Sequence, residues 1–401
     1  MSITSRQIKS LALDTGFDAC GITNINISPH PNPLPKGEGK FPASPAGGQA
    51  GGEGMLVAEE SYLKEWIRQG KHGGMHYLEE YPERQKKFFK EFPDAKNVIV
   101  LGVNYWTGGA TVGATPRPPA GEAGVRPSSD KKRGQVLMPL YQNLSPFFDD
   151  SSTGQTHGSA PTNMVPSGRV ARYAWGKDYH KIISEKLNKL IGKIKNVVAA
   201  NRHACSLQTK NIHLETCVDT KPLLERSLAV EAGLGFIGRQ SQLISPEFGP
   251  WLFLAEIVTN LQLEPDRPIE GNCGRCRKCI DQCPTGAIGE NKSMDARKCI
   301  AYLTIEHKNE IPEELKPKIG DRIFGCDRCL EVCPYTSKQK ETRWKEFKAT
   351  SGAGSRLDLN ELLAIKTNRE YKEKFSDSAI SRATRRQLLR NASIVIENFR
   401  K

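Results

Sequence analysis

Apolar residues along most of the chain recur with the spacing of helices or strands. Residues 5–22 carry an apolar stripe at helical spacing and then turn into a short extended segment. Residues 97–105 form a continuous apolar run, which suits a buried central strand. Further helices are expected at residues 62–67, 178–198 and 223–233, and further strands at residues 216–219 and 251–259. Because helices and strands alternate, the pattern predicts a fold of the α/β or α+β class.

Two stretches break this pattern. Residues 28–54 and about 108–167 are rich in Gly and Pro and poor in apolar side chains. Such segments bury too little apolar surface to offset the entropy that they would lose on ordering. Structureless connections of this length are also uncommon inside compact domains. We therefore expect both stretches to be disordered insertions.

Positive charge is concentrated near the C-terminus. The chain has 401 residues, with 58 Lys+Arg against 45 Asp+Glu, and residues 338–401 contribute most of the excess. A final helix is expected there, with four arginines on one face: Arg382, Arg385, Arg386 and Arg390. Such a face is either simply solvated or binds phosphate, and the absence of interleaved acidic residues favours phosphate.

The sequence lacks the segments that would direct it to a membrane. It has no run of about 18 apolar residues and no export signal at its start, so a cytoplasmic protein without membrane contact is expected. In that reducing compartment cysteines bind metals more often than they form disulfides. Eight of the 11 cysteines lie between residues 273 and 333. The other three, Cys20, Cys205 and Cys217, are expected to be small buried side chains.

The eight clustered cysteines form two related runs. The first, C-x2-C-x2-C-x3-C-P from residue 273, is the pattern that binds [4Fe-4S] clusters in bacterial ferredoxins, where the fourth cysteine ligates the other cluster. The second run repeats this ending over residues 326–334, and Cys299 replaces its missing first cysteine. Zinc is the alternative, but two C-x3-C-P endings are rare in zinc modules. We assign one cluster to Cys273, Cys276, Cys279 and Cys333, and the other to Cys283, Cys299, Cys326 and Cys329.

Other cofactor motifs are incomplete. Residues 233–238, GLGFIG, miss the G-x-G-x-x-G spacing by one position and follow a helix, which argues against a Rossmann site. Asp178 and His180 open like the D-x-H-x-x-G signature of a histidine-ligated corrinoid, but Ile183 stands where glycine is needed. His180 is equally well explained as a residue on a helix surface.

Several longer motifs together closely resemble epoxyqueuosine reductases. They are GRVARYAWGKDYH (residues 168–180), VDTKPLLER (218–226), EAGLGFIG (231–238), SPEFG (245–249), RATRRQLLRN (382–391) and the double cysteine run. The resemblance covers nearly the whole chain apart from the two insertions. It implies a cobalamin-binding α/β domain over residues 1–260, a ferredoxin-like domain with two [4Fe-4S] clusters over residues 261–337, and a basic helical region of HEAT-like type, docking tRNA, over residues 338–401.

The resemblance also implies roles for single residues. Asp219 would donate a proton and contact the cofactor. At the end of an apolar strand it would be desolvated, so we expect its pKa to be raised; the alternative is that Asp219 caps a helix beginning at Pro222. Lys221 stands where the family commonly has a small residue, which would change the charge beside Asp219. The other implied cobalamin contacts are Arg84, Ala171, Leu243, Leu254, Ile257 and Arg328.

The implied reaction is the reduction of epoxyqueuosine to queuosine at the wobble position of tRNA. An external low-potential donor would fill the clusters, which would pass electrons to cobalamin, and two electrons and two protons would be consumed. The expected partners are a tRNA anticodon stem-loop and this donor, and the chain is expected to act as a monomer. The alternatives are a corrinoid reductive dehalogenase, a ferredoxin-type electron carrier and a tRNA-binding module without catalysis.

Overall fold

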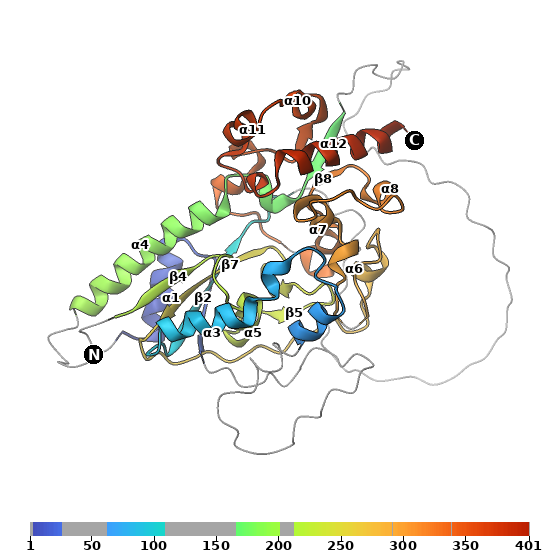
Figure 1. The fold of residues 1–401 in the computed structure, drawn as a ribbon. Coiled ribbons are helices and arrows are strands. Elements are labelled where there is room, and N and C mark those ends of the chain that lie inside the picture. The colour runs from blue at the N-terminus through green and yellow to red at the C-terminus, as the bar shows by residue number, and fades with distance from the viewer. Residues whose placement is uncertain are drawn as a thin grey trace, which may run out of the picture. The chain divides into compact units, whose positions relative to one another are not determined.

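The largest sheet has four antiparallel strands in the order β1-β2-β7-β4 (Figure 1). The computed structural model describes residues 3–25, 62–108, 166–200, 212–290, 292–337 and 339–400. The strands are β1 (Ala19–Asn24), β2 (Asn97–Asn104), β4 (Leu214–Cys217) and β7 (Leu252–Thr259). All eight residues of β2 are buried, because β2 has a strand on either side and helices over both faces.

Helices cover both faces of this sheet. Successive side chains of a strand point to opposite faces, and Ile99 and Leu101 of β2 share one core with α1 and α4. Val98 and Val100 belong to a separate core, which α3 and α5 cover. These helices are α1 (Ser5–Thr15), α3 (Tyr81–Glu91), α4 (Tyr179–Ala200) and α5 (Glu225–Glu231). α5 follows β4 along the chain and covers one face of the sheet. The end of β4 therefore lies next to the core on that face.

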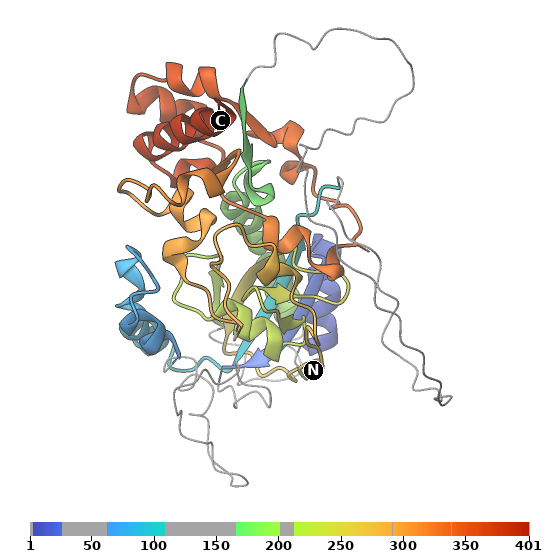
Figure 2. The same cartoon turned by 90° about the vertical axis from the view of Figure 1, so that its right-hand side faces the viewer.

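Shorter strands join segments that are far apart in the sequence. β3 (Ser167–Val170) pairs in parallel with β8 (Arg322–Phe324) and antiparallel with β9 (Arg356–Asp358). Figure 2 shows β3, in green, running beside the C-terminal helices, in red. A separate hairpin contains β5 (Phe236–Ile237) and β6 (Leu243–Ile244).

The cysteine-rich region and the C-terminus are built from short helices. The α-helices are α6 (Lys278–Asp281), α7 (Ile300–Ile305), α8 (Lys316–Ile319), α9 (Arg328–Glu331), α10 (Leu359–Ala364), α11 (Asn368–Phe375) and α12 (Arg385–Arg400). The 3-10 helices are η1 (His76–Leu78), η2 (Arg172–Ala174), η4 (Ala296–Lys298), η5 (Pro334–Thr336), η6 (Lys345–Phe347), η7 (Ala349–Ser351) and η8 (Ala379–Arg382).

The expected helices and strands are present, and residues 62–68 are also helical. Of the two fold classes, α+β describes the main sheet better, since each of its pairings is antiparallel. The expected insertions lie outside the described residues, except at their ends, where β3 already begins at Ser167. None of the described helices combines the length and the apolar character that crossing a membrane requires.

The described residues belong to a single compact unit. One core contains residues from all three of the segments that were expected as domains, and the β8-β3-β9 sheet takes one strand from each. The domain boundaries at residues 260 and 337 therefore remain a sequence-based prediction.

Candidate active site and cluster-binding sites

Four thiols around α6 interact with one another: those of Cys273, Cys276, Cys279 and Cys333. Burial is the main cause that raises the pKa of Cys279 to about 11, and the Cys273 and Cys276 thiols add to this shift. Burial also raises the pKa of Cys333 to about 12, and the other three thiols contribute to the shift. Cys333 reaches this set because it follows α9, which packs against α6.

The second set contains Cys283, Cys299, Cys326 and Cys329. Burial raises the pKa of Cys299, and the Cys283 thiol adds to the shift. Burial also raises the pKa of Cys329, with contributions from Cys326, Cys299 and, in the first set, Cys279. The Cys279 contribution shows that the two sets are neighbours, and the assignment of each cysteine to one cluster stays a sequence-based prediction. Four convergent thiols are the donor set of a [4Fe-4S] cluster, whose binding must displace the thiol protons.

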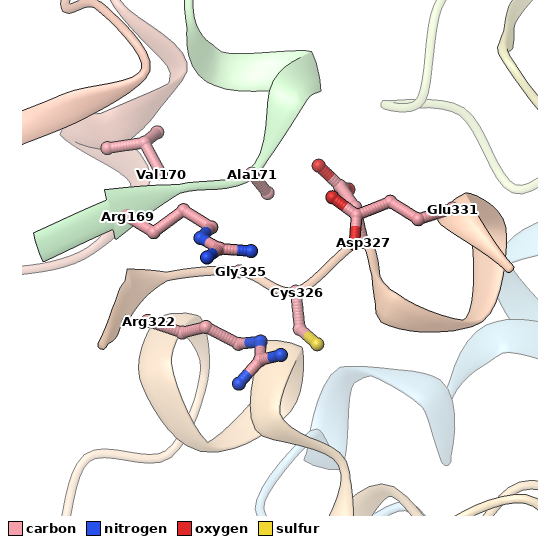
Figure 3. A pocket seen from close by; sticks show the side chains of 8 residues that line it. All are labelled: Arg169, Val170, Ala171, Arg322, Gly325, Cys326, Asp327 and Glu331. Atoms are coloured by element: carbon pink, nitrogen blue, oxygen red, sulfur yellow. The ribbon is translucent and has the colours of Figure 1, made fainter. Parts of the chain in front are cut away.

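A small pocket lies beside Cys326, between β3 and the loop that leads into α9 (Figure 3). Ala171 lies against Gly325, since a Cβ added to that glycine would be 2.5 Å from the Cβ of Ala171. Burial raises the pKa of Asp327 to about 6, and its Oδ2 accepts a hydrogen bond from the backbone N–H of Arg172 at 2.6 Å. The pocket is suited to a water molecule rather than to a corrin ring. Its lining consists of Arg169, Val170, Ala171, Arg322, Gly325, Cys326, Asp327 and Glu331.

Asp219 lies just after β4, in a left-handed backbone conformation (φ 51°) that is uncommon for residues other than glycine. Its backbone N–H donates to Oε1 of Glu225 at 2.8 Å. Its Oδ2 accepts hydrogen bonds from the hydroxyl of Tyr179 at 2.8 Å and from Nη1 of Arg382 at 2.9 Å. Nε2 of His180 lies 3.6 Å from the same oxygen. Three side chains therefore converge on one carboxylate oxygen.

The expected rise in the pKa of Asp219 is wrong. Burial acts to raise this pKa, but hydrogen bonds and charge from His180, Arg382 and Tyr179 outweigh burial and lower it to about 2. Burial acts to lower the pKa of His180, but hydrogen bonds to Asp178 and Asp219 raise it to about 9. Nδ1 of His180 lies 2.8 Å from Oδ1 of Asp178. At neutral pH the proton shared by His180 and Asp219 therefore resides on His180.

Asp219 does not cap the helix that follows it. That helix, α5, begins at Glu225 rather than at Pro222, and Leu224 occupies its N-cap position. Nζ of Lys221 lies 3.0 Å from a carboxylate oxygen of Glu215.

A second carboxyl group is buried close to this centre. Glu256 of β7 is 0% exposed, and neither of its carboxyl oxygens has a hydrogen-bond partner among the described residues. It pairs with Cys217, which lies two residues before Asp219. Burial, together with Glu225 and Asp219, raises the pKa of Glu256 well above its usual range. Burial and Asp219 also raise the pKa of Glu225 to about 7, so Glu256 is held neutral and Glu225 is partly protonated near neutral pH.

The residues expected to contact cobalamin do not all share one surface. Leu243 of β6 and Leu254 of β7 belong to the core on the α5 face of the sheet. The side chain of Ile257 instead lies in the core on the opposite face, so a contact there would have to come from its backbone. Arg84 is exposed on α3, and Arg328 lies on α9 beside the second set of thiols.

Two buried polar side chains, one beside β6 and one on β7, lack hydrogen-bond partners among the described residues. Nε2 of Gln240, in the turn between β5 and β6, is buried and has no hydrogen-bond partner within the described part of the chain. The Glu256 carboxyl group is equally unpartnered. Buried polar groups of this kind need hydrogen-bond partners, and the amide side chains of a corrin are groups that can supply them.

The four C-terminal arginines do not share one helix face, and that expectation is wrong. α12 begins at Arg385, so Arg382 lies in the preceding η8, where it binds Asp219. Arg385 donates to a backbone carbonyl, and Arg390 donates to carbonyls at the C-terminal end of α7, where helical carbonyls lack internal partners. Only Arg386 is exposed and without a partner among the described residues.

Sequence reasoning did not identify Tyr179, His180 or Glu225 as part of the site, and it gave Arg382 a different role. The spacing of Asp178 and His180 was a usable local signal, because it brings the two side chains together at the start of α4. Arg382 carries no local signal, since it is 163 residues from Asp219.

The chain is similar to known proteins along nearly its whole length. Residues 272–336 match the family model "4Fe-4S double cluster binding domain", and residues 150–220 match "Epoxyqueuosine reductase QueG, DUF1730". The epoxyqueuosine reductase of Aliivibrio fischeri is 41% identical over 98% of this chain and 82% of its own length. That of Xanthomonas campestris is 30% identical over 98% of this chain and 86% of its own length.

A solved structure also shares the fold. It is a crystal structure of epoxyqueuosine reductase with an epoxyqueuosine-modified tRNA-Tyr stem loop, is 26% identical, and covers 98% of this chain and 81% of its own chain with a TM-score of 0.67. Its likeness extends through the sheet, the cysteine region and the C-terminal helices. With relatives of this identity matching nearly its whole length, the chain belongs to the epoxyqueuosine reductase family.

Proposed function

We propose that this chain reduces the epoxide of epoxyqueuosine in tRNA to the alkene of queuosine. The reaction consumes two electrons and two protons and releases one water, so the site must deliver both kinds of particle. The proposal rests above all on the Asp219 carboxylate, which His180, Tyr179 and Arg382 surround. The match of residues 272–336 to a double-cluster domain supports two sets of four thiols that would suit electron transfer.

Electrons would enter through two [4Fe-4S] clusters held by the two sets of thiols. Cobalamin would supply the strongly reducing metal centre that an epoxide requires. Leu243 and Leu254 would hold it on the α5 face, with Gln240 and Glu256 at its polar edge. We also propose that α10, α11 and α12 are the start of a HEAT-like region.

One of the two protons would come from side chains of this chain, and the other would come from solvent. Asp219 is ionised and lies 3.6 Å from protonated His180, so the proton stays on His180 until the leaving oxygen gains negative charge and would then move through the Asp219 carboxylate to that oxygen in one concerted transfer. Asp178 holds the other ring nitrogen of His180 in place. Tyr179 and Arg382 orient the Asp219 oxygen, and this fixed geometry favours proton transfer. Asp219 is thus the proposed proton donor to the substrate, and His180 is the group that holds this proton at neutral pH.

The substrate would be the anticodon stem-loop, with its modified base extended into the Asp219 site. Of the four C-terminal arginines expected to bind phosphate, Arg386 is the one available for a phosphate contact. An external low-potential donor would supply the electrons. We propose that the chain acts as a monomer in the cytoplasm, where it would meet its tRNA substrate.

Anaerobic reconstitution of the full chain tests this function. With iron, sulfide and cobalamin supplied, eight irons and one corrinoid per chain are expected. With a low-potential reductant, digests of epoxyqueuosine-containing tRNA should then show queuosine by mass spectrometry. A fully loaded protein that forms no queuosine would contradict the activity, whereas eight irons without bound corrinoid would contradict the cofactor.

Replacing His180 by glutamine is expected to change the pH dependence of the reaction. In the unaltered chain, activity should fall as pH rises through about 9, because His180 then loses the proton that it passes to Asp219. The same raised pKa means that the His180 contact stabilises the fold fully below its ordinary pKa of about 6.5, and that this contribution is lost as pH rises through about 9.

The H180Q variant cannot titrate at this position, so its single-turnover rates should lack the alkaline step and be about 10²-fold lower near neutral pH. His213→Gln is a matched control, because His213 also pairs with an aspartate, at 3.2 Å, on the surface away from the site. An alkaline step that persists near pH 9 in H180Q would show that another group holds the proton.

A further inference from the structure

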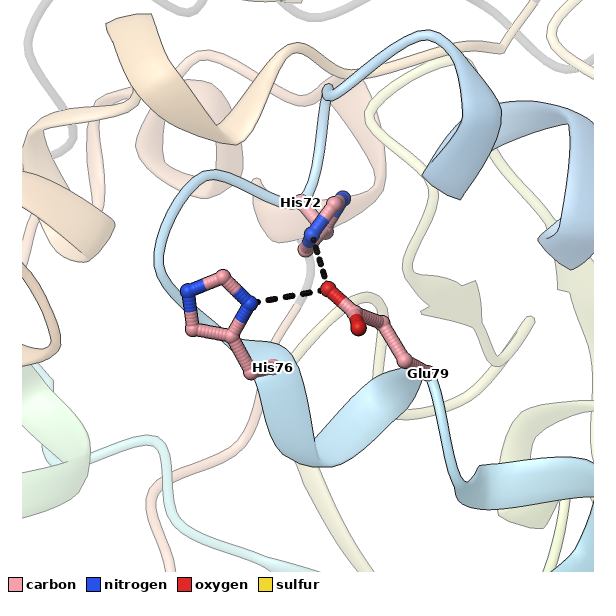
Figure 4. Close-up of side chains that lie close together, drawn as sticks. All are labelled: His72, His76 and Glu79. Carbon is pink, nitrogen blue, oxygen red and sulfur yellow. Dashed lines mark hydrogen bonds and ion pairs between the residues drawn. The ribbon is translucent and has the colours of Figure 1, made fainter.

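A histidine and carboxylate cluster lies outside the Asp219 site, in the turn that precedes α3 (Figure 4). Oε1 of Glu79 is 3.1 Å from Nε2 of His72 and 2.8 Å from Nδ1 of His76. The three ligand atoms lie within 4.8 Å of one another. The proposed proton chemistry uses none of these groups.

The spacing of these atoms suits tetrahedral coordination. Ligands at the usual Zn–N and Zn–O distances of about 2.0–2.1 Å are separated from one another by about 3.3 Å in a tetrahedron. The two distances to Glu79 are close to that value, so these two contacts need to change by only a few tenths of an ångström, and the two histidine nitrogens lie within 4.8 Å of each other. Two imidazoles and one carboxylate are a donor set that zinc sites use, with water in the fourth position.

The exposure of the three side chains also suits an ion that enters from solvent. The His72 side chain is 9% exposed and is held against Trp66, whereas those of His76 and Glu79 are 76% and 47% exposed. One ligand is thus preorganised and two face water. The hydrogen bonds from His76 and His72 lower the pKa of Glu79, which keeps its carboxylate ionised and available to a cation.

We propose that His72, His76 and Glu79 form a binding site for one divalent transition-metal ion, and that the ion is Zn²⁺. Zinc prefers imidazole nitrogen together with carboxylate oxygen, while Mg²⁺ and Ca²⁺ prefer oxygen ligands alone. The site is separate from both sets of thiols.

The ion would hold the turn that carries Tyr77 in one conformation. This turn is attached to the cysteine region through bonds of Trp66 to the Met294 carbonyl at 2.6 Å and of the Ala296 N–H to the Lys71 carbonyl at 2.9 Å. Tyr77 lies between His76 and Glu79 in the sequence. It interacts with Arg382, the partner of Asp219. A bound metal ion would therefore hold Tyr77 in a fixed position beside the proposed active site.

Zinc binding can be measured on the reconstituted protein. After equilibrium dialysis against Zn²⁺, mass spectrometry of metals should find one zinc per chain in addition to eight irons. The zinc X-ray absorption edge should show a first shell of nitrogen and oxygen only, because thiolate sulfur lies about 0.3 Å farther out. His76→Gln and Glu79→Gln should each weaken zinc binding at least about tenfold and leave the iron content unchanged.

The variants target the two exposed ligands, because substitution of the buried His72 would also disturb packing. His213→Gln serves as the control, since it removes an exposed histidine of a single histidine–aspartate pair and should leave zinc binding unchanged. The proposal is overturned if the unaltered chain retains no zinc, if H76Q and E79Q retain as much as the unaltered chain, if the zinc shell contains sulfur, or if a ninth iron occupies the site instead.

Discussion

The Asp219→Asn variant is expected to lose about 10²- to 10⁴-fold in the rate of epoxide reduction. Asparagine has nearly the same shape but cannot carry the transferred proton. It also removes the negative charge that raises the pKa of His180, so the imidazole would lose its proton at lower pH. Single-turnover reduction of epoxyqueuosine-containing tRNA, with iron and corrinoid contents determined on the same samples, measures the effect.

Two comparisons make this result specific. Asp14→Asn, on the exposed side of α1, should leave the rate unchanged. The double variant D219N/H180Q should be no slower than D219N alone, because groups that pass one proton act as a unit and their effects do not add. A normal rate in D219N with full cofactor content would move the proton donor to another residue.

Replacing Cys333 by alanine is expected to remove the same four irons as replacing Cys279. The two thiols interact within one set, although they belong to different runs of the sequence. The double variant C279A/C333A should therefore keep four irons, whereas C329A/C333A should keep none, because Cys329 belongs to the other set. Electron transfer to the substrate should stop in all of these variants.

Iron analysis and electron paramagnetic resonance of the reduced protein distinguish these outcomes. Cys20→Ala is the control and should keep all eight irons, since Cys20 lies in β1, away from both sets. If instead C279A/C333A lost eight irons and C329A/C333A kept four, each run of cysteines would bind its own cluster, and the exchanged assignment would fail.

Features with a local physical cause were predictable from the sequence. β2 must be apolar at nearly every position because both of its faces are buried, so its sequence indicates both its structure and its central place. The cysteine spacings are also local, because a short loop presents several thiols to one centre. Cys333 is far along the chain from the other three cysteines of its assigned set. It could be assigned to that set only because, in the double-run pattern, the last cysteine of each run ligates the cluster of the other run.

Features that depend on distant contacts were not predictable. The shift at Asp219 depends on His180 and also on Arg382, which η8 brings to it from far along the chain. Burial alone suggested a raised pKa, and three hydrogen-bond donors reversed it. Arg390 resembles a surface arginine in the sequence, but it bonds to carbonyls at the end of α7. The spacing of polar residues indicates which face of a helix is polar, but it does not indicate what packs against that face.

The pairing of β3 has a consequence for the order in which the chain assembles. β3 lies between β8 and β9, and Arg356 of β9 bonds to the Ser167 carbonyl of β3, 189 residues earlier. At about 5–20 residues per second, a ribosome needs about 10–40 s to make that interval. For most of this time β3 has neither partner; β8, which leads directly to Cys326, is made first and can pair with β3, and β9 completes the sheet last. A chain truncated before β9 would therefore hold the loop to Cys326 only through the two-stranded pair of β3 and β8, and a pair of strands is marginally stable by itself, so loading of the second set of thiols is expected to be less complete in such a chain.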